Sequence, residues 1–255
     1  MPTAKAAALK ALAIDDSLAE PHAALGLYYS NYGWDPAAAE RELRRAIELK
    51  PNYATAYHWL GDAPLLSMGR FDEAVAAGRR AAELDPLSPV ISADTAYILI
   101  SARRYDDAIA QGQRALLLDP NFYYTHYILG LAYYEKGMYA EAISECRRSL
   151  QLNPDPFAKA TLALALSKSG GRAEAVKLRD ELKAETARRY VPGYFLAIIC
   201  GAVGDKDEAF KWLEKDFTER APYLVAMPVD PAFDDLRTDQ RFAALRERVA
   251  TAKLD

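Results

Sequence analysis

Three histidines are the residues of this chain best suited to acid–base or metal chemistry. His22, His58 and His126 stand about one repeat length or two apart along the chain. An imidazole can bind a transition metal or transfer a proton near neutral pH. However, no cluster of Cys or His has the spacing of a metal site, and the sequence contains no glycine-rich phosphate loop, HExxH or GxSxG motif. We therefore expect no catalytic residue, no metal and no cofactor, so that the protein is not an enzyme.

The two cysteines also provide no site. Cys146 and Cys200 are far apart in the sequence and form no CxxC motif. Isolated thiols of this kind suit a reducing compartment, where they pack as small apolar residues. The N-terminus lacks the apolar centre of a signal peptide, and no run of about 18 apolar residues occurs. We therefore expect a cytoplasmic protein that does not interact with a membrane.

The segments that contain these residues repeat at a regular spacing. A short aliphatic and charged stretch ends at Pro51, Pro86, Pro120 and Pro154, so it recurs every 34 or 35 residues. Within each period, apolar residues at helical spacing indicate two short helices separated by a turn. One helical hairpin cannot bury its own apolar face, so neighbouring hairpins must stack to form a continuous core.

The spacing within each period resembles that of the tetratricopeptide repeat (TPR), with His in place of Trp and Cys in place of Phe. The residues that carry the pattern in one period are His126, Leu129, Gly130, Tyr133, Ala142, Cys146 and Pro154. The resemblance covers about residues 3–221. It implies an all-α fold, a right-handed α-solenoid of antiparallel helical hairpins. It also places His22 and His126 at the aromatic packing position of the motif, whereas His58 lies one residue further along and could face the groove.

We expect a single solenoid domain over residues 1–255. Its predicted parts are a half repeat at 3–16, repeats at 19–53, 54–88, 89–122, 123–155, 156–189 and 190–221, and a C-terminal helical cap at 222–255. Asp230 and Asp239 are suited to cap helices in this last part. Because the chain opens in mid-repeat, we expect a fragment of a longer protein. The cap sequence resembles the C-terminal end of TPR arrays in long bacterial signalling proteins.

The charge balance argues against a nucleic-acid partner. The formal net charge is −4, whereas proteins that bind DNA or RNA usually have a basic surface. A series of cations does recur one period apart, but acidic residues are interleaved with it on the same predicted helices. We expect a solvated outer face with ion pairs within each helix. The cations are Lys10, Arg45, Arg80, Arg114 and Arg148.

The first helix of each repeat has a second apolar face besides its packing face. Tyr124, Tyr127, Leu131 and Tyr134 recur at helical spacing, and a surface helix should be apolar on two faces only if both are covered. In the TPR family the equivalent face lines the concave groove where peptides bind, and tyrosine is well suited to such contacts. The alternative is that packing of the superhelix buries these rings. The candidate groove residues are His58, Asp62, Tyr97, Tyr124, Tyr127, Leu131, Tyr134, Tyr194 and Ile198.

The resemblance favours a protein-interaction module that binds an apolar or aromatic-containing peptide or helix in the groove. The partner is expected to be a protein or peptide, which could be a domain of the same parent protein. The Lys, Asn and Arg residues with which chaperone-binding TPR domains hold a carboxylate are absent here. The alternative function is self-association into a homodimer. If solvent lines the groove, Tyr127→Ala should cost the fold under about 1 kcal/mol, whereas Leu129→Ala on the packing face should cost about 2–5 kcal/mol.

Pro64 is predicted to distort the helix that contains it. It follows Leu60 and Gly61 within the first helix of the second repeat. Since proline has no N–H, it should break the hydrogen bond to the Leu60 carbonyl and kink the helix.

Overall fold

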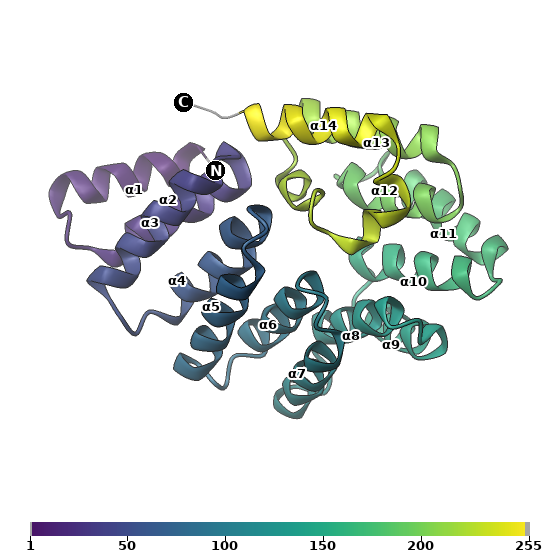
Figure 1. Ribbon diagram of the computed structural model, residues 1–255, viewed down its shortest axis with the longest axis horizontal. Helices are drawn as coiled ribbons and strands as arrows, with labels where there is room; N and C mark the ends of the chain where they lie inside the picture. The colour runs from purple at the N-terminus through teal and green to yellow at the C-terminus, as the bar shows by residue number, and fades with distance from the viewer. Residues whose placement is uncertain (1, 253–255) are drawn as a thin grey trace.

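The computed structural model describes residues 2–252, which form helices and turns and no strand (Figure 1). The chain has an all-α helical repeat fold, which confirms the fold class predicted from the 34–35-residue spacing. A single helix, α1 (Pro2–Ile14), precedes six helical hairpins. The hairpins are α2 (Ala19–Tyr28) with α3 (Pro36–Leu49), α4 (Ala54–Leu60) with α5 (Phe71–Leu84), α6 (Pro89–Ser101) with α7 (Tyr105–Leu118), α8 (Tyr123–Glu135) with α9 (Tyr139–Leu152), α10 (Pro156–Lys168) with α11 (Arg172–Glu185), and α12 (Gly193–Ala202) with α13 (Lys206–Glu219).

The remaining elements are short turns and one final helix. Two π-helical turns, η1 (Tyr29–Gly33) and η2 (Gly61–Leu65), extend the ends of α2 and α4. After α13 the chain forms two 3₁₀ turns, η3 (Pro222–Ala226) and η4 (Pro231–Leu236), followed by α14 (Gln240–Thr251). We refer to residues 222–236 as the C-terminal segment.

Polar caps start several of the helices. Asp155 is one example: its carboxylate accepts a hydrogen bond of 3.0 Å from the backbone N–H of Ala158, and Pro156 follows at the first helical position. A cap of this kind satisfies one of the N–H groups that lack an acceptor in the first turn, and proline there loses no helical hydrogen bond. The sequence therefore sets where these helices begin.

Glycine allows the two helices of a hairpin to cross closely. A Cβ atom on Gly130 would lie 2.5 Å from Sγ of Cys146, and one on Gly26 would overlap Cγ of Leu43. Both positions are too close for real atoms, so a larger residue would force the helices apart. Cys146 and Leu43 are fully buried at these crossings, so the close approach excludes voids from the core.

His22 and His126 have structural roles within their hairpins. Nδ1 of His22 lies 2.7 Å from the Glu42 carboxylate, and Nδ1 of His126 lies 2.6 Å from the Glu145 carboxylate. Each contact joins a first helix to the second helix of the same hairpin. Nε2 of His126 also donates to the carbonyl of Pro120 at 3.1 Å, so this ring has no nitrogen left for another role.

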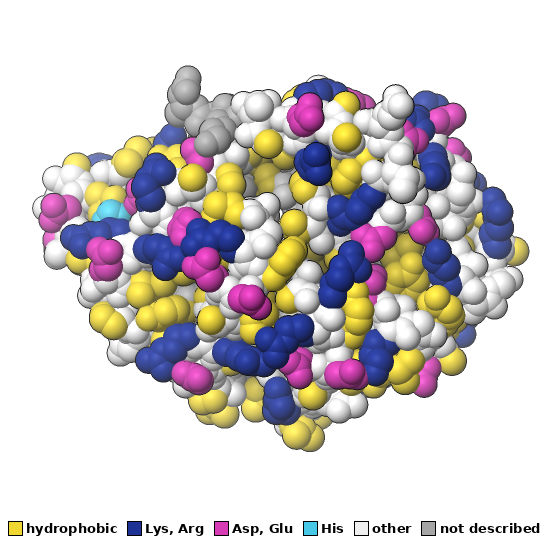
Figure 2. Space-filling view, viewed as in Figure 1, with side chains coloured by type: hydrophobic (Ala, Val, Ile, Leu, Met, Phe, Trp, Pro, Cys, Tyr) yellow, Lys and Arg dark blue, Asp and Glu magenta, His cyan; other side chains and the backbone are white. Residues whose placement is uncertain are grey.

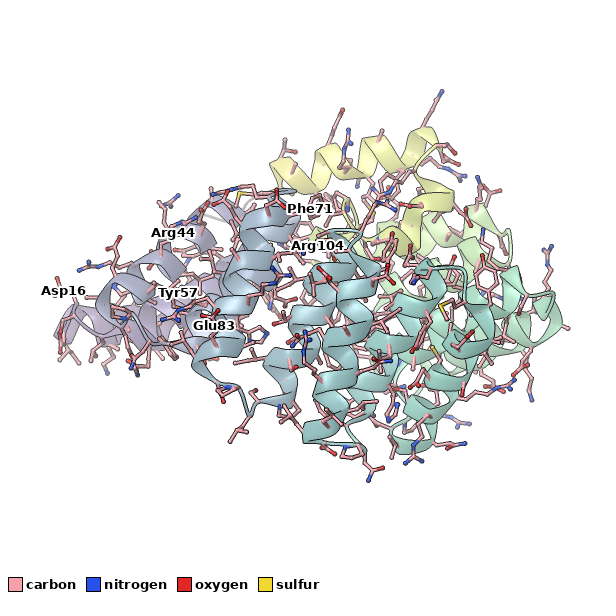
Figure 3. All side chains as sticks on the ribbon, turned by 60° about the horizontal axis from the view of Figure 1, so that its bottom comes forward. Asp16, Arg44, Tyr57, Phe71, Glu83 and Arg104 are labelled. Atoms are coloured by element: carbon pink, nitrogen blue, oxygen red, sulfur yellow. The ribbon has the colours of Figure 1, made fainter. Side chains whose placement is uncertain are left out.

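The outer face consists of the second helices and is covered by ion pairs. Figure 2 shows dark blue and magenta side chains interleaved over one face of the molecule, and Figure 3 labels Arg44, Glu83 and Arg104 among the side chains on the ribbon. Arg44 pairs with Glu40 one turn away at 2.7 Å, and Arg80 pairs with Glu83 at 3.0 Å. This arrangement agrees with the expected solvated face and leaves no exclusively basic stripe there.

The hairpins follow an arc, and the C-terminal segment lies inside it. In Figure 1 the arc runs from α1 at the left, through α5–α7 at the bottom, to α12–α14 at the upper right. The ends of the arc meet at Trp34, which is 2% exposed and lies 5.7 Å from the ring of Phe217. The Arg220 guanidinium lies 4.5 Å from the Trp34 ring centroid and donates hydrogen bonds to the carbonyls of Gly33 and Ala252, at 3.3 and 2.6 Å. The first hairpin is thereby joined to the C-terminal residues.

The helix that contains Pro64 continues through this residue by widening instead of ending. Pro64 lies inside the π-helical turn η2, a form that often occurs where a helix must accommodate an irregular residue. The widened turn places Asp62 and Ala63 on the concave side, where both line the cavity described below.

Candidate functional site

The concave side of the arc contains a cavity of about 460 Å³. First helices form one wall of it, together with η2, and residues 222–232 of the C-terminal segment form the other. Most of the groove residues predicted from the sequence line this cavity: Asp62, Tyr97, Tyr124, Tyr127, Leu131, Tyr194 and Ile198. Tyr134 does not line it, because its ring packs 5.9 Å from Tyr139 in a separate surface hollow. His58 is not among the lining residues but bonds to Asp94, which is one of them.

Aromatic side chains of the C-terminal segment fill one end of the concave side. The ring of Tyr223 lies 5.5 Å from Phe157 and 5.3 Å from Phe195, within the range of favourable edge and tilted contacts. Phe233 is fully buried, with its ring 4.8 Å from that of Tyr194. The segment thus packs on the first helices through aromatic contacts, and its Leu224, Met227 and Leu236 side chains are buried in the same core.

A polar contact fixes the segment at the same end. The Tyr194 hydroxyl donates to the carboxylate of Asp230, whose other oxygen accepts from the N–H of Ala232 at 2.9 Å. Asp230 therefore caps η4, as its position before a proline predicted, and also binds the groove. Burial raises the pKa of Asp230 above its usual range, and the Tyr194 hydroxyl partly offsets that effect.

Two of the predicted groove tyrosines, Tyr127 and Tyr194, are buried by the chain itself, whereas Tyr97, Tyr124 and Tyr134 are half-buried. Tyr127 is 7% exposed and Tyr194 is 4% exposed. Burial raises the pKa of Tyr97, Tyr124, Tyr127 and Tyr194 well above the usual value, so these rings stay neutral. The condition under which Tyr127→Ala would cost little is not met, and its expected cost is revised below.

A cluster of His58, Asp62 and Asp94 lies toward the other end. Nε2 of His58 lies 2.7 Å from the Asp94 carboxylate, and both side chains are 11% exposed. The ligand-type atoms of the three residues all lie within 4.8 Å of one another. A histidine with two carboxylates is a donor set that divalent metals accept, and two close carboxylates also attract organic cations. We call these three residues the acidic cluster.

The electrostatics of the acidic cluster are set by burial and by the closeness of two carboxyl groups to one imidazole. Asp62 makes no hydrogen bond or ion pair with any residue from 2 to 252 that the structure records. Burial, and then the neighbouring charge of Asp94, raise the pKa of Asp62 to about 7, while His58 opposes this shift. Burial lowers the pKa of His58, but the hydrogen bond to Asp94 and the negative charges of Asp94 and Asp62 together outweigh burial, so the net shift is upward. None of the described residues lining the cavity is Lys or Arg.

Sequence reasoning missed several residues that form the site. Asp94 stands 36 residues after His58, about one repeat, so the two were placed to face each other on neighbouring first helices. That spacing was an available signal. Phe157, Phe195 and Tyr223 had no comparable signal, because their contacts depend on where the non-repeating C-terminal segment folds back.

The two cysteines lie outside the site. Cys146 and Cys200 are buried free thiols. Burial raises the pKa of the Cys200 thiol to about 12 and that of Cys146 further, so neither forms a reactive thiolate near neutral pH.

Comparison with protein families supports the assignment of the repeat. Residues 35–89 and 94–155 match the family model described as the tetratricopeptide repeat, in agreement with the TPR resemblance drawn from the residue spacing. A search of curated proteins found no match. No helix within residues 2–252 has the length and apolar character needed to cross a bilayer.

Solved structures share the fold at low sequence identity. PilW, a type IV pilus biogenesis factor, is 19% identical, with 86% of this chain and 97% of that chain covered and a TM-score of 0.60. PilF of Pseudomonas aeruginosa is 20% identical over 89% of this chain and 99% of that chain, with a TM-score of 0.55. A thermophilic TPR protein of Thermus thermophilus is 18% identical over 89% of this chain and 98% of that chain, with a TM-score of 0.51. At these identities the similarity establishes the helical repeat fold alone.

Proposed function

We propose that this protein is a protein-interaction module whose concave groove binds an apolar, aromatic-containing polypeptide segment. The observation that carries the proposal is that the groove already holds such a segment, residues 222–236 of the same chain. Tyr223 and Phe233 of that segment contact rings from α10 and α12. A surface that binds two aromatic side chains in this way has the chemistry of a peptide groove.

The C-terminal segment also limits what can bind. With the segment in place, the remaining space of about 460 Å³ admits a few side chains and not a helix. A partner must therefore displace the segment or insert side chains beneath it. An attached segment competes at an effective concentration on the order of millimolar for a short linker, so it lowers the apparent affinity of any partner.

A peptide supplied in trans tests this function. The probe is a fluorescent peptide of residues 221–238, added to the full chain and to a Tyr223→Ala variant whose own segment is weakened. We expect fluorescence anisotropy to detect binding to the variant and much less to the wild-type chain. A peptide in which both Tyr223 and Phe233 are replaced by Ala is the matched control. Equal binding of the two peptides, or binding of neither, would rule out an aromatic groove.

Self-association is the second candidate function. If the C-terminal segment can leave its own groove, it can occupy the groove of a second copy and form a homodimer by exchange. Light scattering over a range of concentrations separates the two functions: a monomer at all concentrations excludes exchange as the function. A dimer that Tyr223→Ala dissociates would favour exchange over binding of a different partner.

We also propose a cellular setting for the module. The buried free thiols Cys146 and Cys200 fit a reducing cytoplasm. The cap sequence supports a place within a larger bacterial signalling protein, with the partner supplied by another domain of that protein. Sequencing the gene upstream of Met1 tests this setting, because an effector domain encoded there would supply the signalling output.

A further inference from the structure

We propose that the segment bound by the groove carries a lysine whose ammonium group enters the cavity between Asp62 and Asp94. This inference rests on the proposed function, because it specifies the chemistry of the same ligand. It is drawn from the charge of the cavity, the geometry of the acidic cluster and the composition of the chain's own segment.

The cavity is lined by three carboxyl groups, and the one basic side chain beside them is His58, which pairs with Asp94. Asp62, Asp94 and Asp230 all line it, and none of the described lining residues is Lys or Arg. Asp230 is bound by Tyr194, and Asp94 is bound by His58 and by the Tyr124 hydroxyl. Asp62 has no hydrogen-bond partner among residues 2–252. A carboxylate in such a position is stabilised by an incoming cation, which supplies both hydrogen bonds and opposite charge.

The surrounding side chains suit the rest of a lysine. Tyr97, Tyr124 and Tyr127 line the same cavity, and their rings can pack against an alkyl chain and attract an ammonium group. A metal ion would use only the acidic cluster and would leave this aromatic wall without a role. The volume of about 460 Å³ accommodates an extended side chain together with a neighbouring residue.

An ammonium group suits the acceptors that line this part of the cavity. Asp62 lies on η2, Asp94 on α6 and Tyr124 on α8, so the acceptors approach from three different elements. An ammonium has three donors directed away from one centre, whereas a guanidinium is planar and matches acceptors that lie in one plane. A lysine ammonium can therefore donate to acceptors on all three elements.

The C-terminal segment provides no cation at the end of the groove that contains Asp62 and Asp94. Residues 222–236 supply aromatic side chains but contain no Lys, Arg or His. The segment thus makes the aromatic contacts at one end and offers no cation to Asp62 and Asp94 at the other. An external segment with both an aromatic residue and a lysine would gain a contact that the internal one lacks. That gain is what would allow it to displace the internal segment.

The experiment compares three versions of the 221–238 peptide at position 225, because Val225 of the segment lines the cavity near Ala63. The versions carry Lys, norleucine or Glu there, and each is titrated against the Tyr223→Ala chain by anisotropy. We expect the Lys peptide to bind about 10–100-fold more tightly than the norleucine peptide, the range of a charge-assisted contact. The Glu peptide should bind more weakly than either. Adding Asp62→Asn and Asp94→Asn should remove the preference for Lys, whereas Asp72→Asn on the exposed face of α5 should retain it.

The other outcomes separate this inference from the proposed function. Equal binding of the Lys and norleucine peptides would overturn the inference and leave the groove function standing. Failure of all three peptides would overturn both. Calorimetry with n-butylammonium alone and with Zn²⁺ alone identifies other occupants of the acidic cluster. Binding of n-butylammonium as tight as that of the Lys peptide would indicate a free amine, and binding of Zn²⁺ without any Lys preference would indicate a metal site. Either result would overturn the lysine proposal.

Discussion

The two ends of the concave groove are built from the same repeat and are completed differently. At the end formed by α10 and α12, the C-terminal segment inserts Phe233 and bonds Asp230 to Tyr194, so apolar and polar groups are both satisfied. At the end formed by α4 and α6, Asp62 and Asp94 line the cavity, and Asp62 has no hydrogen-bond partner among residues 2–252. The first end resembles a protein core, whereas the second leaves acidic and aromatic side chains accessible from the cavity.

The difference shows that the repeat positions the side chains of the concave face but does not determine whether they are buried. Each first helix presents the same face to the inside of the arc, and neighbouring repeats place those faces side by side. Whether a face becomes core or site depends on what covers it. Here the C-terminal segment, which lies outside the repeat, determines the outcome. It supplies aromatic and polar partners at one end of the groove and no cation for Asp62 and Asp94 at the other.

The largest expected loss of stability comes from removing a buried aromatic side chain at the end of the groove formed by α10 and α12. Phe233→Ala removes a fully buried ring and leaves a cavity beside Tyr194, so it should lower the free energy of unfolding by about 3–5 kcal/mol. Urea unfolding measures the loss, and hydrogen exchange should increase first in residues 222–236. A loss under about 1 kcal/mol with unchanged exchange would mean that the two ends do not differ as described.

The next largest effect is expected at the junction of the two ends. Tyr127 lies 5.6 Å from Tyr124 and 5.3 Å from Phe157 and is buried, so Tyr127→Ala should destabilise by about 2–4 kcal/mol. Leu129→Ala, at a residue 1% exposed on the packing face, is the reference and should cost about 2–5 kcal/mol. Thermal melts compare the two. A cost for Tyr127→Ala under about 1 kcal/mol would restore the solvent-lined groove and contradict the cover described here.

The fold could be predicted from the sequence because the repeat is local and periodic. Spacings of 34–35 residues, with Gly130 and Gly26 at the crossings, determine helix pairs that contact their neighbours. The position of His126 within the repeat likewise indicated a packing role, and its contact with Glu145 agrees. Such inferences need only residues within one or two repeats.

The closure of the groove could not be predicted in the same way. Tyr223 and Phe233 lie in a segment that does not follow the repeat. Their burial depends on how strongly the whole array of hairpins curves, because the curvature sets where this segment meets the first helices. The contact of Arg220 with Trp34 joins positions far apart in the chain. No local pattern encodes such a contact, so the aromatic face could be recognised from the sequence but its cover could not.

A smaller effect, of opposite sign, is expected at the open end. The pKa of the Asp62 carboxyl is about 7 in the folded chain and about 3.9 when unfolded. Between these values the folded state holds a proton that the unfolded state has lost, so stability falls as pH rises from about 4 to 7. Asp62→Asn should therefore stabilise the fold by about 1–3 kcal/mol at pH 8 and change it little at pH 4.

Other groups change stability in the same direction and must be separated from Asp62. Burial raises the pKa of Glu135 to about 7 and of Asp216 to about 6, and these two remain in the variant. His58 has a raised pKa through Asp94, so its stabilising contact is also lost as pH rises. Urea titrations of wild type and Asp62→Asn at pH 4, 6 and 8 isolate the difference. The same pH dependence of the unfolding free energy in both proteins would show that folding does not disfavour the charged form of Asp62, which would contradict its raised pKa.

The smallest effect is expected at the rim of the open end. Val90 lines the same cavity but is 43% exposed, so its methyl groups already contact water in the folded chain. Val90→Ala should change the free energy of unfolding by less than about 0.5 kcal/mol, because little apolar surface is transferred from the interior. It should also change the affinity for the Lys peptide far less than Asp62→Asn does, because Val90 offers no charge to the ammonium group. Thermal melts and the same anisotropy titration measure both quantities. A loss above about 1 kcal/mol would mean that the rim is covered in solution, which would make the two ends of the groove alike and remove the open site on which the lysine proposal depends.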